Sequence, residues 1–402
     1  MIEATLKFSI PSQHDGSLLE CRIYHPLNEG RSSAGRCCAA IVAHPYAPLG
    51  GSMDDAVVQL IASACLADGL IVGIFNFRGA GRSQGRTSWQ GKAEMEDYQS
   101  FIAFVLYYLH HLRRLSTEDR LLSTSQYLSS RGSLNDLSET NSLSPQLEPS
   151  SFQSLLLLAG YSYGALITMA LPSSLELILA PFESPEPDSV FSEIRRCAET
   201  LALRSRKNGH QSSSTQNRPP SAATRGPDLL ETRETPIAIS RIDHNIRVAY
   251  ILISPLHGIV RDFLTLWTLR NWSFSSPTSP TDLKLQTNPT LAIYGDSDIF
   301  VGIKQLRRWA VPLAEVEIAQ GGNQFRHVEV AGASHFWHDE HHSHILGEEH
   351  YKVQEYQLVS AGLEIFIPFS TSEMLALRRH HLADTITKQD LDYATILAPR
   401  NF

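Results

Sequence analysis

The stretch LLLLAGYSYGALITMALP, residues 155–172, constrains the fold more than any other part of this 402-residue chain. Its four leucines have the composition of a buried strand, and the apolar segment that begins at Gly164 is typical of a helix. Between the two, Ser162 stands with a tyrosine on each side and a glycine beyond each tyrosine. A strand that passes so abruptly into a helix predicts a sharp turn, which presents one hydroxyl group at the end of a sheet.

Apolar runs of strand length recur along the chain and alternate with helical segments. Helices are predicted over Asp54–Leu66 and over residues 91–113, where acidic residues come early and basic residues late, as the helix dipole favours. The first 25 residues alternate apolar and polar positions around a His-Asp-Gly turn, which predicts an antiparallel hairpin. Continuous apolar strands that alternate with helices imply a mostly parallel sheet with helices on both faces, an α/β fold. Besides the leucine run, the strand-like segments are CCAAIVAHP, GLIVGIFNFRG, IRVAYILISPL, PTLAIYGDSD and, more weakly, FRHVEVAGASH.

Two polar stretches do not fit this alternation. Residues 115–150 hold ten serines among 36 positions, and the stretch at about 205–240 is polar with a Pro-Pro pair. Neither could bury enough apolar surface to offset the entropy that is lost on ordering. We therefore expect one domain over residues 1–350, which carries both stretches as disordered surface insertions. Residues 351–402 are interpreted as a C-terminal extension.

Composition and charge narrow the class of protein. Hydrophobic residues make up 42 % of the chain, which is enough for a sizeable core, and the net charge of −8 gives no reason to expect a nucleic-acid partner. No apolar stretch approaches the roughly 20 residues of a membrane-spanning helix. The five cysteines form no C-x-x-C pair, and no signal peptide is visible at the N-terminus. These features predict a cytoplasmic protein without a membrane span.

The pattern Gly-Tyr-Ser-Tyr-Gly marks Ser162 as a candidate nucleophile. A serine hydroxyl attacks poorly until a base takes its proton, and that base needs an acid to orient it. Two carboxyl groups, Asp296 and Asp298, follow the predicted strand PTLAIYG, and His335 lies in a loop after the last predicted strand. These residues supply an acid and a base in the chain order Ser, Asp, His.

At this point the chain resembles the α/β-hydrolase superfamily. IYGDSDIFVG is similar to the segment that carries the family's acid three residues after a glycine, which implies Asp298, and GASHFW is similar to the family's histidine loop, which implies His335. Asp296 remains an alternative acid, although a turn residue that caps its own backbone is the favoured interpretation. The resemblance covers residues 1–114, 151–204 and 243–345, and it implies an α/β-hydrolase fold with polar insertions.

The resemblance also implies an oxyanion hole. AHPYAPLGGSMDD is similar to the turn that follows the third strand in this family, so the Tyr46 N–H is expected to be one donor, with His44 and Pro45 shaping the turn. The Tyr163 N–H, at the start of the helix after the nucleophile, is expected to be the other.

A third loop, NFRGAGRSQG, is similar to an Arg-Gly-x-Gly-x-Ser loop of the same family. For this loop we favour a structural role, with Gly79 and Gly81 in a tight turn and Arg78 in a local ion pair.

The histidine-rich segment HFWHDEHHSH, residues 335–344, raises the alternative of a zinc site. It has no H-E-x-x-H spacing, and no partner ligand is anchored on a second element. We therefore predict neither a metal nor any other cofactor. The residues after His335 are expected to begin a solvated helix, with Phe336 and Trp337 at the pocket mouth or in the core.

Taken together, these residues predict a serine hydrolase that cleaves a carboxylic ester or thioester of a small-molecule acyl substrate. An acyl-carrier thiohydrolase or an acyltransferase would use the same residues, and a catalytically silent α/β-hydrolase that binds a ligand is the alternative outside enzymes. Between Ser162 and Asp298 we expect a lid that sets the substrate. Within it, residues 181–204 and 257–269 look apolar on one face, which favours an acyl chain over a sugar or a phosphate. Oligomeric state is not predicted.

Overall fold

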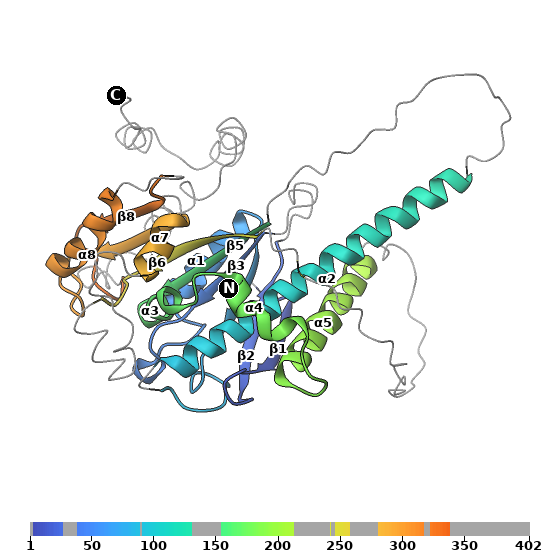
Figure 1. Ribbon diagram of the computed structural model, residues 1–402, viewed down its shortest axis with the longest axis horizontal. Helices are drawn as coiled ribbons and strands as arrows, with labels where there is room; N and C mark the ends of the chain where they lie inside the picture. Colours follow the sequence, from blue (N-terminus) through green and yellow to red (C-terminus); the bar gives the residue numbers. More distant parts are fainter. Residues whose placement is uncertain are drawn as a thin grey trace, which may run out of the picture.

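The computed structural model describes residues 3–26, 38–88, 91–130, 154–212, 242, 246–257, 280–316 and 322–337. These residues build one eight-stranded sheet in the order β1-β2-β4-β3-β5-β6-β7-β8 (Figure 1). The strands are β1 Leu6–Pro11, β2 Leu18–Tyr24, β3 Cys38–Ala43, β4 Ile71–Phe75, β5 Ser154–Tyr161, β6 Ile246–Ile253, β7 Thr290–Gly295 and β8 Phe325–Val330.

Strand β2 pairs with β1 and with β4 in antiparallel register, and every other pairing in the sheet is parallel. The hairpin and all six later strands lie where the apolar runs predict them. Strand β3 lies between β4 and β5, so the chain moves outward in opposite directions from this point. In open α/β sheets a crevice forms at the carboxyl ends of the strands where the order reverses, which brings the turns after β3 and β5 together.

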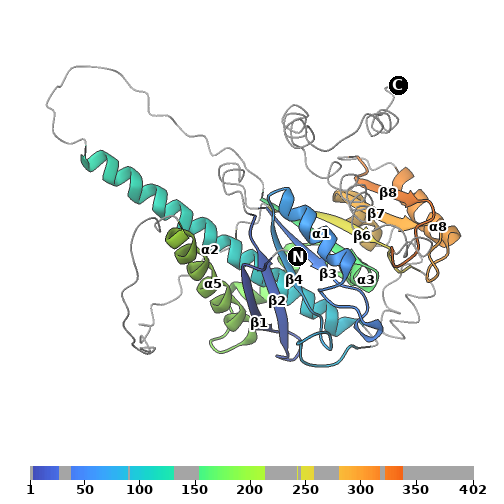
Figure 2. The same cartoon turned by 180° about the vertical axis from the view of Figure 1, so that it is seen from behind.

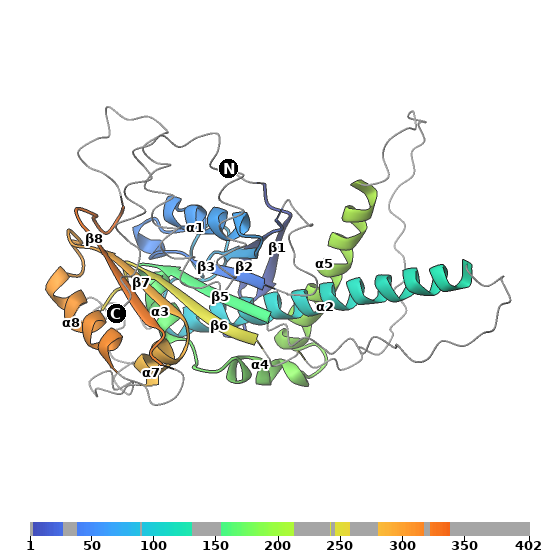
Figure 3. The ribbon, with the colours of Figure 1, turned by 90° about the horizontal axis from the view of Figure 1, so that it is seen from above.

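The helices cover both faces of the sheet, and their contacts follow the alternation of side chains along the strands. Ala39 and Ile41 of β3 pack in the larger cluster, with α2 and α3, whereas Ala40 and Val42 point to the opposite cluster, with α1. Figure 3 shows α1 on one side of the sheet and α2, α3 and α4 on the other. The helices are α1 Ala56–Ala67, α2 Lys92–Ser130, α3 Tyr163–Ala170, α4 Leu175–Glu183, α5 Val190–Ser212, α7 Pro280–Thr287 and α8 Ile303–Glu315, with the short 3₁₀ helix η2 at Ala47–Leu49.

Helix α2 corrects the expected boundary of the first insertion. It begins at Lys92 as predicted but continues to Ser130, so the first part of the stretch 115–150 is helical. Once a helix has formed, each added residue gains one backbone hydrogen bond, which outweighs the modest propensity cost of scattered serines. The remainder, residues 131–153, lies outside the described residues, as does the C-terminal extension 351–402.

Helix α5 corrects the expectation of a lid over residues 181–204. It packs against α2, α4 and strand β1, and Figures 1 and 2 show it alongside the long α2. The apolar face that the sequence shows in this segment is therefore buried against the body of the protein. The helix continues to Ser212, into the second expected insertion. The rest of that insertion lies outside the described residues apart from Ile242, and so does nearly all of the second lid segment, 257–269.

Within the described part of the chain, no single helix is long and apolar enough to cross a membrane. Helices α3 and α4 reach the length and apolar composition of such a helix only when they are taken together, and a bend of 75° separates them.

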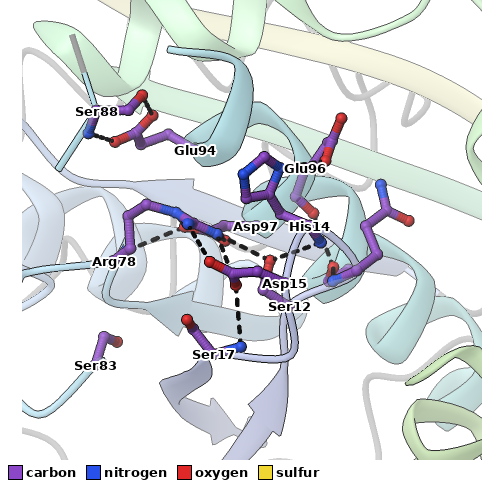
Figure 4. A network of polar contacts seen from close by, with 12 residues as sticks. Ser12, His14, Asp15, Ser17, Arg78, Ser83, Ser88, Glu94, Glu96 and Asp97 are labelled. Carbon is purple, nitrogen blue, oxygen red and sulfur yellow. Dashed lines mark hydrogen bonds and ion pairs between the residues drawn. The ribbon is translucent and has the colours of Figure 1, made fainter. Parts of the chain in front are cut away.

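Arg78 ties the hairpin to the body of the domain (Figure 4). Its guanidinium donates to Asp97 of α2 at 2.6 and 3.0 Å and to Asp15 of the β1–β2 turn at 2.9 Å. Arg78 is 4 % exposed and Asp97 is fully buried. In the same loop Gly79 and Gly81 have φ values of 77° and 52°, as a tight turn requires. The loop therefore has the structural role that its sequence favours, but the ion pairs of Arg78 are not local, because Asp15 and Asp97 lie on other elements.

Replacing Arg78→Met should lower the free energy of unfolding by about 3 kcal/mol or more, because Asp97 would remain buried without its charged partner. Arg82→Met is the matched control: Arg82 also pairs with a carboxylate, but its side chain is 84 % exposed, and such pairs contribute about 1 kcal/mol or less. Urea denaturation of both variants measures the difference. Equal, small losses would contradict a structural role for the Arg78 network.

Candidate active site

Ser162 occupies a strained turn between β5 and α3. Its φ of 56° and ψ of −113° lie outside the regions that side chains favour, a departure that costs about 1–3 kcal/mol and persists only when the surroundings hold it. Here the Ser162 N–H donates to the carbonyl of Ile253 in β6 at 2.8 Å. The turn is therefore fixed by the neighbouring strand, and the seryl side chain projects beyond the end of the sheet.

The two glycines of the pattern are required by close backbone contacts. A Cβ at Gly160 would lie 2.5 Å from the carbonyl carbon of Gly164, and a Cβ at Gly164 would overlap the carbonyl of Ala43 in β3. No side chain fits at either position without moving the backbone. Because both side chains are absent, the chain can turn this tightly around Ser162.

Ser162, His335 and Asp298 form a continuous chain of hydrogen bonds. The Ser162 Oγ lies 2.8 Å from His335 Nε2, and His335 Nδ1 lies 2.7 Å from Asp298 Oδ2. In the tautomer whose Nδ1–H donates to the Asp298 carboxylate, Nε2 is left to accept the seryl proton. The three residues are only 6, 3 and 7 % exposed. The structure thus brings together the three residues that the sequence selects for the triad.

The turn after β7 fixes the carboxylate of Asp298. Its second oxygen, Oδ1, accepts hydrogen bonds from the backbone N–H groups of Phe300 and Val301 at 2.8 and 3.0 Å. Three donors therefore hold one side chain, and its orientation toward His335 does not depend on solvent.

Asp296 does not reach the histidine. Its Oδ1 accepts from the Gly332 N–H at 2.8 Å and from the Ser297 hydroxyl at 3.0 Å. Asp296 is a turn residue, as the sequence predicts. It does not cap its own backbone, however, because the N–H group that it accepts from belongs to Gly332, in the loop after β8. Asp296 thereby joins the loop that carries Asp298 to the loop that carries His335.

The histidine loop is held from several directions that the sequence did not reveal. The Tyr161 hydroxyl donates to the His335 carbonyl at 2.9 Å, and the Trp337 indole donates to Ser254 Oγ at 3.0 Å. A Cβ at Gly295 would overlap the Ala333 carbonyl, so only glycine lets this loop approach the end of β7. Tyr161 could have been noticed because it belongs to the Gly-x-Ser-x-Gly pattern, whereas nothing near Ser254 marks it.

Tyr46 and Tyr163, the expected oxyanion donors, lie next to one another. Tyr163 is the first residue of α3, where the helix itself offers its N–H no acceptor. Tyr46 immediately precedes η2 in an extended conformation, and the two rings are 5.1 Å apart. Their role as donors remains a prediction.

His44 has a structural role in the turn before Tyr46. Its Nδ1 donates to the Pro45 carbonyl at 2.6 Å, and its Nε2 accepts from the Phe77 N–H at 2.9 Å. Burial lowers the pKa of His44 to about 4, so the ring stays neutral and keeps both hydrogen bonds at physiological pH. It shapes the turn, as the motif implies.

Lys284 of α7 holds the C-terminal end of α3. The ammonium group, which is 3 % exposed, donates to the carbonyls of Thr168, Met169 and Leu171 at 3.3, 2.8 and 2.9 Å. These carbonyl groups lie at the C-terminal end of α3. The last carbonyl groups of a helix have no N–H donor within the helix, and the helix dipole favours a cation beside them. Burial lowers the pKa of Lys284 to about 7. Both ends of α3 are therefore held by neighbouring elements, the start by β6 and the end by α7.

No group of histidine, cysteine, aspartate and glutamate side chains within the described residues could hold a metal ion. His335 is hydrogen-bonded to Ser162 and Asp298, and the other histidines of the HFWHDEHHSH segment lie outside the described residues.

The fold follows from the strand order and the turn at Ser162 together. The Ser162 turn follows the central parallel strand β5, Asp298 follows β7 and His335 follows β8, with the serine at a strained strand-to-helix turn. The chain has the α/β-hydrolase fold. This confirms the fold class and the resemblance that the motifs imply.

No protein-family model and no curated protein matches the chain. Solved α/β-hydrolase structures are similar to it over most of both lengths. An α-β serine hydrolase homologue from Coxiella burnetii has 17 % identity, a TM-score of 0.39, and covers 90 % of this chain and 98 % of its own. XC6422 from Xanthomonas campestris, described as an α/β serine hydrolase without a lid, has 17 % identity, a TM-score of 0.42 and coverages of 92 and 99 %. Est1E from Butyrivibrio proteoclasticus has 12 % identity, a TM-score of 0.38 and coverages of 89 and 98 %.

The two aspartates should differ sharply when each is replaced by asparagine. Asp298→Asn should slow the reaction of Ser162 with a fluorophosphonate by several orders of magnitude, because the equivalent change in a serine protease triad costs about 10⁴ in kcat. Asp296→Asn should change the rate by less than about threefold, since the amide oxygen can still accept from Gly332. The readout is the second-order labelling rate, with melting temperature measured alongside. A slow Asp296→Asn and a fast Asp298→Asn would reverse the assignment of the acid.

Proposed function

We propose that the chain is a serine hydrolase that cleaves a carboxylic ester or thioester through an acyl-enzyme intermediate. The observation that carries the proposal is the buried hydrogen-bond chain from Ser162 through His335 to Asp298, at 2.8 and 2.7 Å. Nucleophile, base and orienting acid within hydrogen-bond reach are what acyl transfer needs.

In the first half-reaction the Ser162 Oγ attacks the acyl carbonyl while His335 Nε2 takes the seryl proton. Asp298 holds the imidazole by Nδ1 and stabilises the imidazolium that forms. The N–H groups of Tyr46 and Tyr163 are the proposed donors to the oxyanion of the tetrahedral intermediate. His335 then returns the proton to the departing oxygen or sulfur, which leaves as the alcohol or thiol.

In the second half-reaction a water molecule attacks the acyl group on Ser162. His335 takes a proton from the water and returns it to Ser162 Oγ as the carboxylic acid is released. All proton transfers pass through one nitrogen atom, so the orientation of a single imidazole controls both halves. No cofactor takes part in the proposed reaction.

The substrate is proposed to be a small-molecule acyl compound, either free or attached to a carrier. An acyltransferase would share the first half-reaction and differ only in the nucleophile that removes the acyl group. A catalytically silent scaffold is disfavoured, because a binding protein has no need for three aligned residues and a strained serine.

Labelling with a fluorophosphonate tests the nucleophile directly. The wild-type chain should be labelled once, at Ser162, and Ser162→Ala and His335→Ala should abolish labelling while the melting temperature stays within a few degrees. Ser174→Ala is the matched control; it removes the cap of α4 and should leave labelling intact. Labelling that survives in Ser162→Ala would show that another residue reacts.

Turnover separates hydrolysis from transfer. Oxygen esters and thioesters with the same acyl group should both release the free acid in a Ser162-dependent reaction, with added alcohol capturing only a minor share. If most of the acyl group passes to the alcohol at millimolar concentrations, the chain is an acyltransferase.

A further inference from the structure

Apolar side chains remain exposed beside the catalytic histidine. Among the described residues Ile299 and Phe336 are 77 and 42 % exposed. Ile299 directly follows the acid Asp298, and Phe336 directly follows His335. Exposed apolar side chains next to a polar site can mark the place where an apolar part of a ligand binds.

Phe300, which follows Ile299 in the chain, contacts both Phe336 and the imidazole. Its ring centroid lies 4.5 Å from that of His335 and 5.6 Å from that of Phe336. The Phe336 ring meets the imidazole edge-on, at 5.5 Å and 86°. We call Ile299, Phe300 and Phe336 the apolar wall. It stands against the histidine, with a half-buried inner part at Phe300 and an exposed outer part.

The position of the wall identifies the part of an ester that would touch it. His335 Nε2 must come within about 3 Å of the leaving oxygen to protonate it. The group attached to that oxygen therefore lies on the histidine side of the site. The carbonyl oxygen would instead face the backbone N–H groups of Tyr46 and Tyr163, the proposed oxyanion donors, whose rings lie 5.1 Å apart.

The chemistry of the wall favours an apolar group. None of its three side chains carries a charge or a hydrogen-bonding atom, and the adjacent Asp298 carboxylate is already held by three donors. A hydroxyl group pressed against this surface would lose its hydrogen bonds to water without replacement. An alkyl or aryl group would instead bury apolar area and stack against the exposed ring of Phe336.

We propose that the apolar wall binds the alcohol portion of the substrate, so that esters of apolar alcohols are cleaved in preference to esters of polyols and sugars. This inference rests on the proposed hydrolysis. In the step concerned, the bond from Ser162 Oγ to the acyl carbon forms and the bond from that carbon to the alcohol oxygen breaks. The seryl proton leaves on the alcohol.

Three butyrate esters test the preference: benzyl butyrate, methyl butyrate and 2-hydroxyethyl butyrate. They share one acyl group, so kcat/KM compares only the steps up to release of the alcohol. Benzyl butyrate should exceed 2-hydroxyethyl butyrate by about tenfold or more, the size of effect that a small apolar contact produces. Methyl butyrate gives the baseline without a wall contact.

Two variants locate the effect. Phe336→Ala and Ile299→Ala should each lower the benzyl-to-methyl ratio of kcat/KM several-fold. Leu283→Ala is the matched control, because Leu283 is also a large exposed apolar residue, 53 % exposed, but lies on α7; it should leave the ratio unchanged. Ile299 carries the test if Phe336→Ala fails to fold.

The outcomes separate this inference from the proposed function. Ser162-dependent hydrolysis with equal kcat/KM for benzyl and 2-hydroxyethyl butyrate would overturn the wall and leave the hydrolase intact. A benzyl preference that Ile299→Ala and Phe336→Ala both leave unchanged would also overturn it. Absence of any Ser162-dependent hydrolysis would remove the proposed function itself.

Discussion

The strained backbone of Ser162 is the constraint on which the rest of the site depends. A φ of 56° at a non-glycine residue is held by a hydrogen bond to β6 and by glycines that let α3 approach the end of β3. If this hydrogen bond or either glycine were lost, the backbone of Ser162 could relax to an ordinary turn. Its hydroxyl group would then no longer lie within hydrogen-bond distance of His335. The leucine-rich strand β5 matters for the same reason, since it anchors the turn in the middle of the sheet.

The other half of the site is built at the neighbouring strand ends. Strands β7 and β8 pair in parallel up to Gly295 and Val330, so the acid and histidine loops leave the sheet side by side. Asp296 bridges the two loops through Gly332, and the missing side chain at Gly295 lets Ala333 approach. The relative positions of Asp298 and His335 are therefore a consequence of sheet register. The apolar wall arises because the same two loops carry the residues that follow Asp298 and His335.

Much of this could be predicted from the sequence, because the signals are local. The strand-to-helix turn at Ser162 depends on a few adjacent residues with special backbone needs, and the Asp298 and His335 segments are short motifs that resemble those of the α/β-hydrolases. The extent of α2, the packing of α5 on α2 instead of over the site, and the roles of Tyr161, Ser254 and Lys284 depend on contacts between distant segments. No local pattern contains that information. The oxyanion donors, Tyr46 and Tyr163, lie between these cases: their positions follow from motifs, but their function is a prediction.

The central claim is that Ser162 carries the acyl group during turnover. The most direct measurement is rapid acid quenching of the chain with a slowly deacylating ester, followed by peptide mass spectrometry. We predict an added acyl mass on the peptide that contains Ser162, which forms within the first turnover, decays as substrate is exhausted and is absent in His335→Ala. Turnover without any acylated peptide, or an acyl group on a different residue, would contradict the claim.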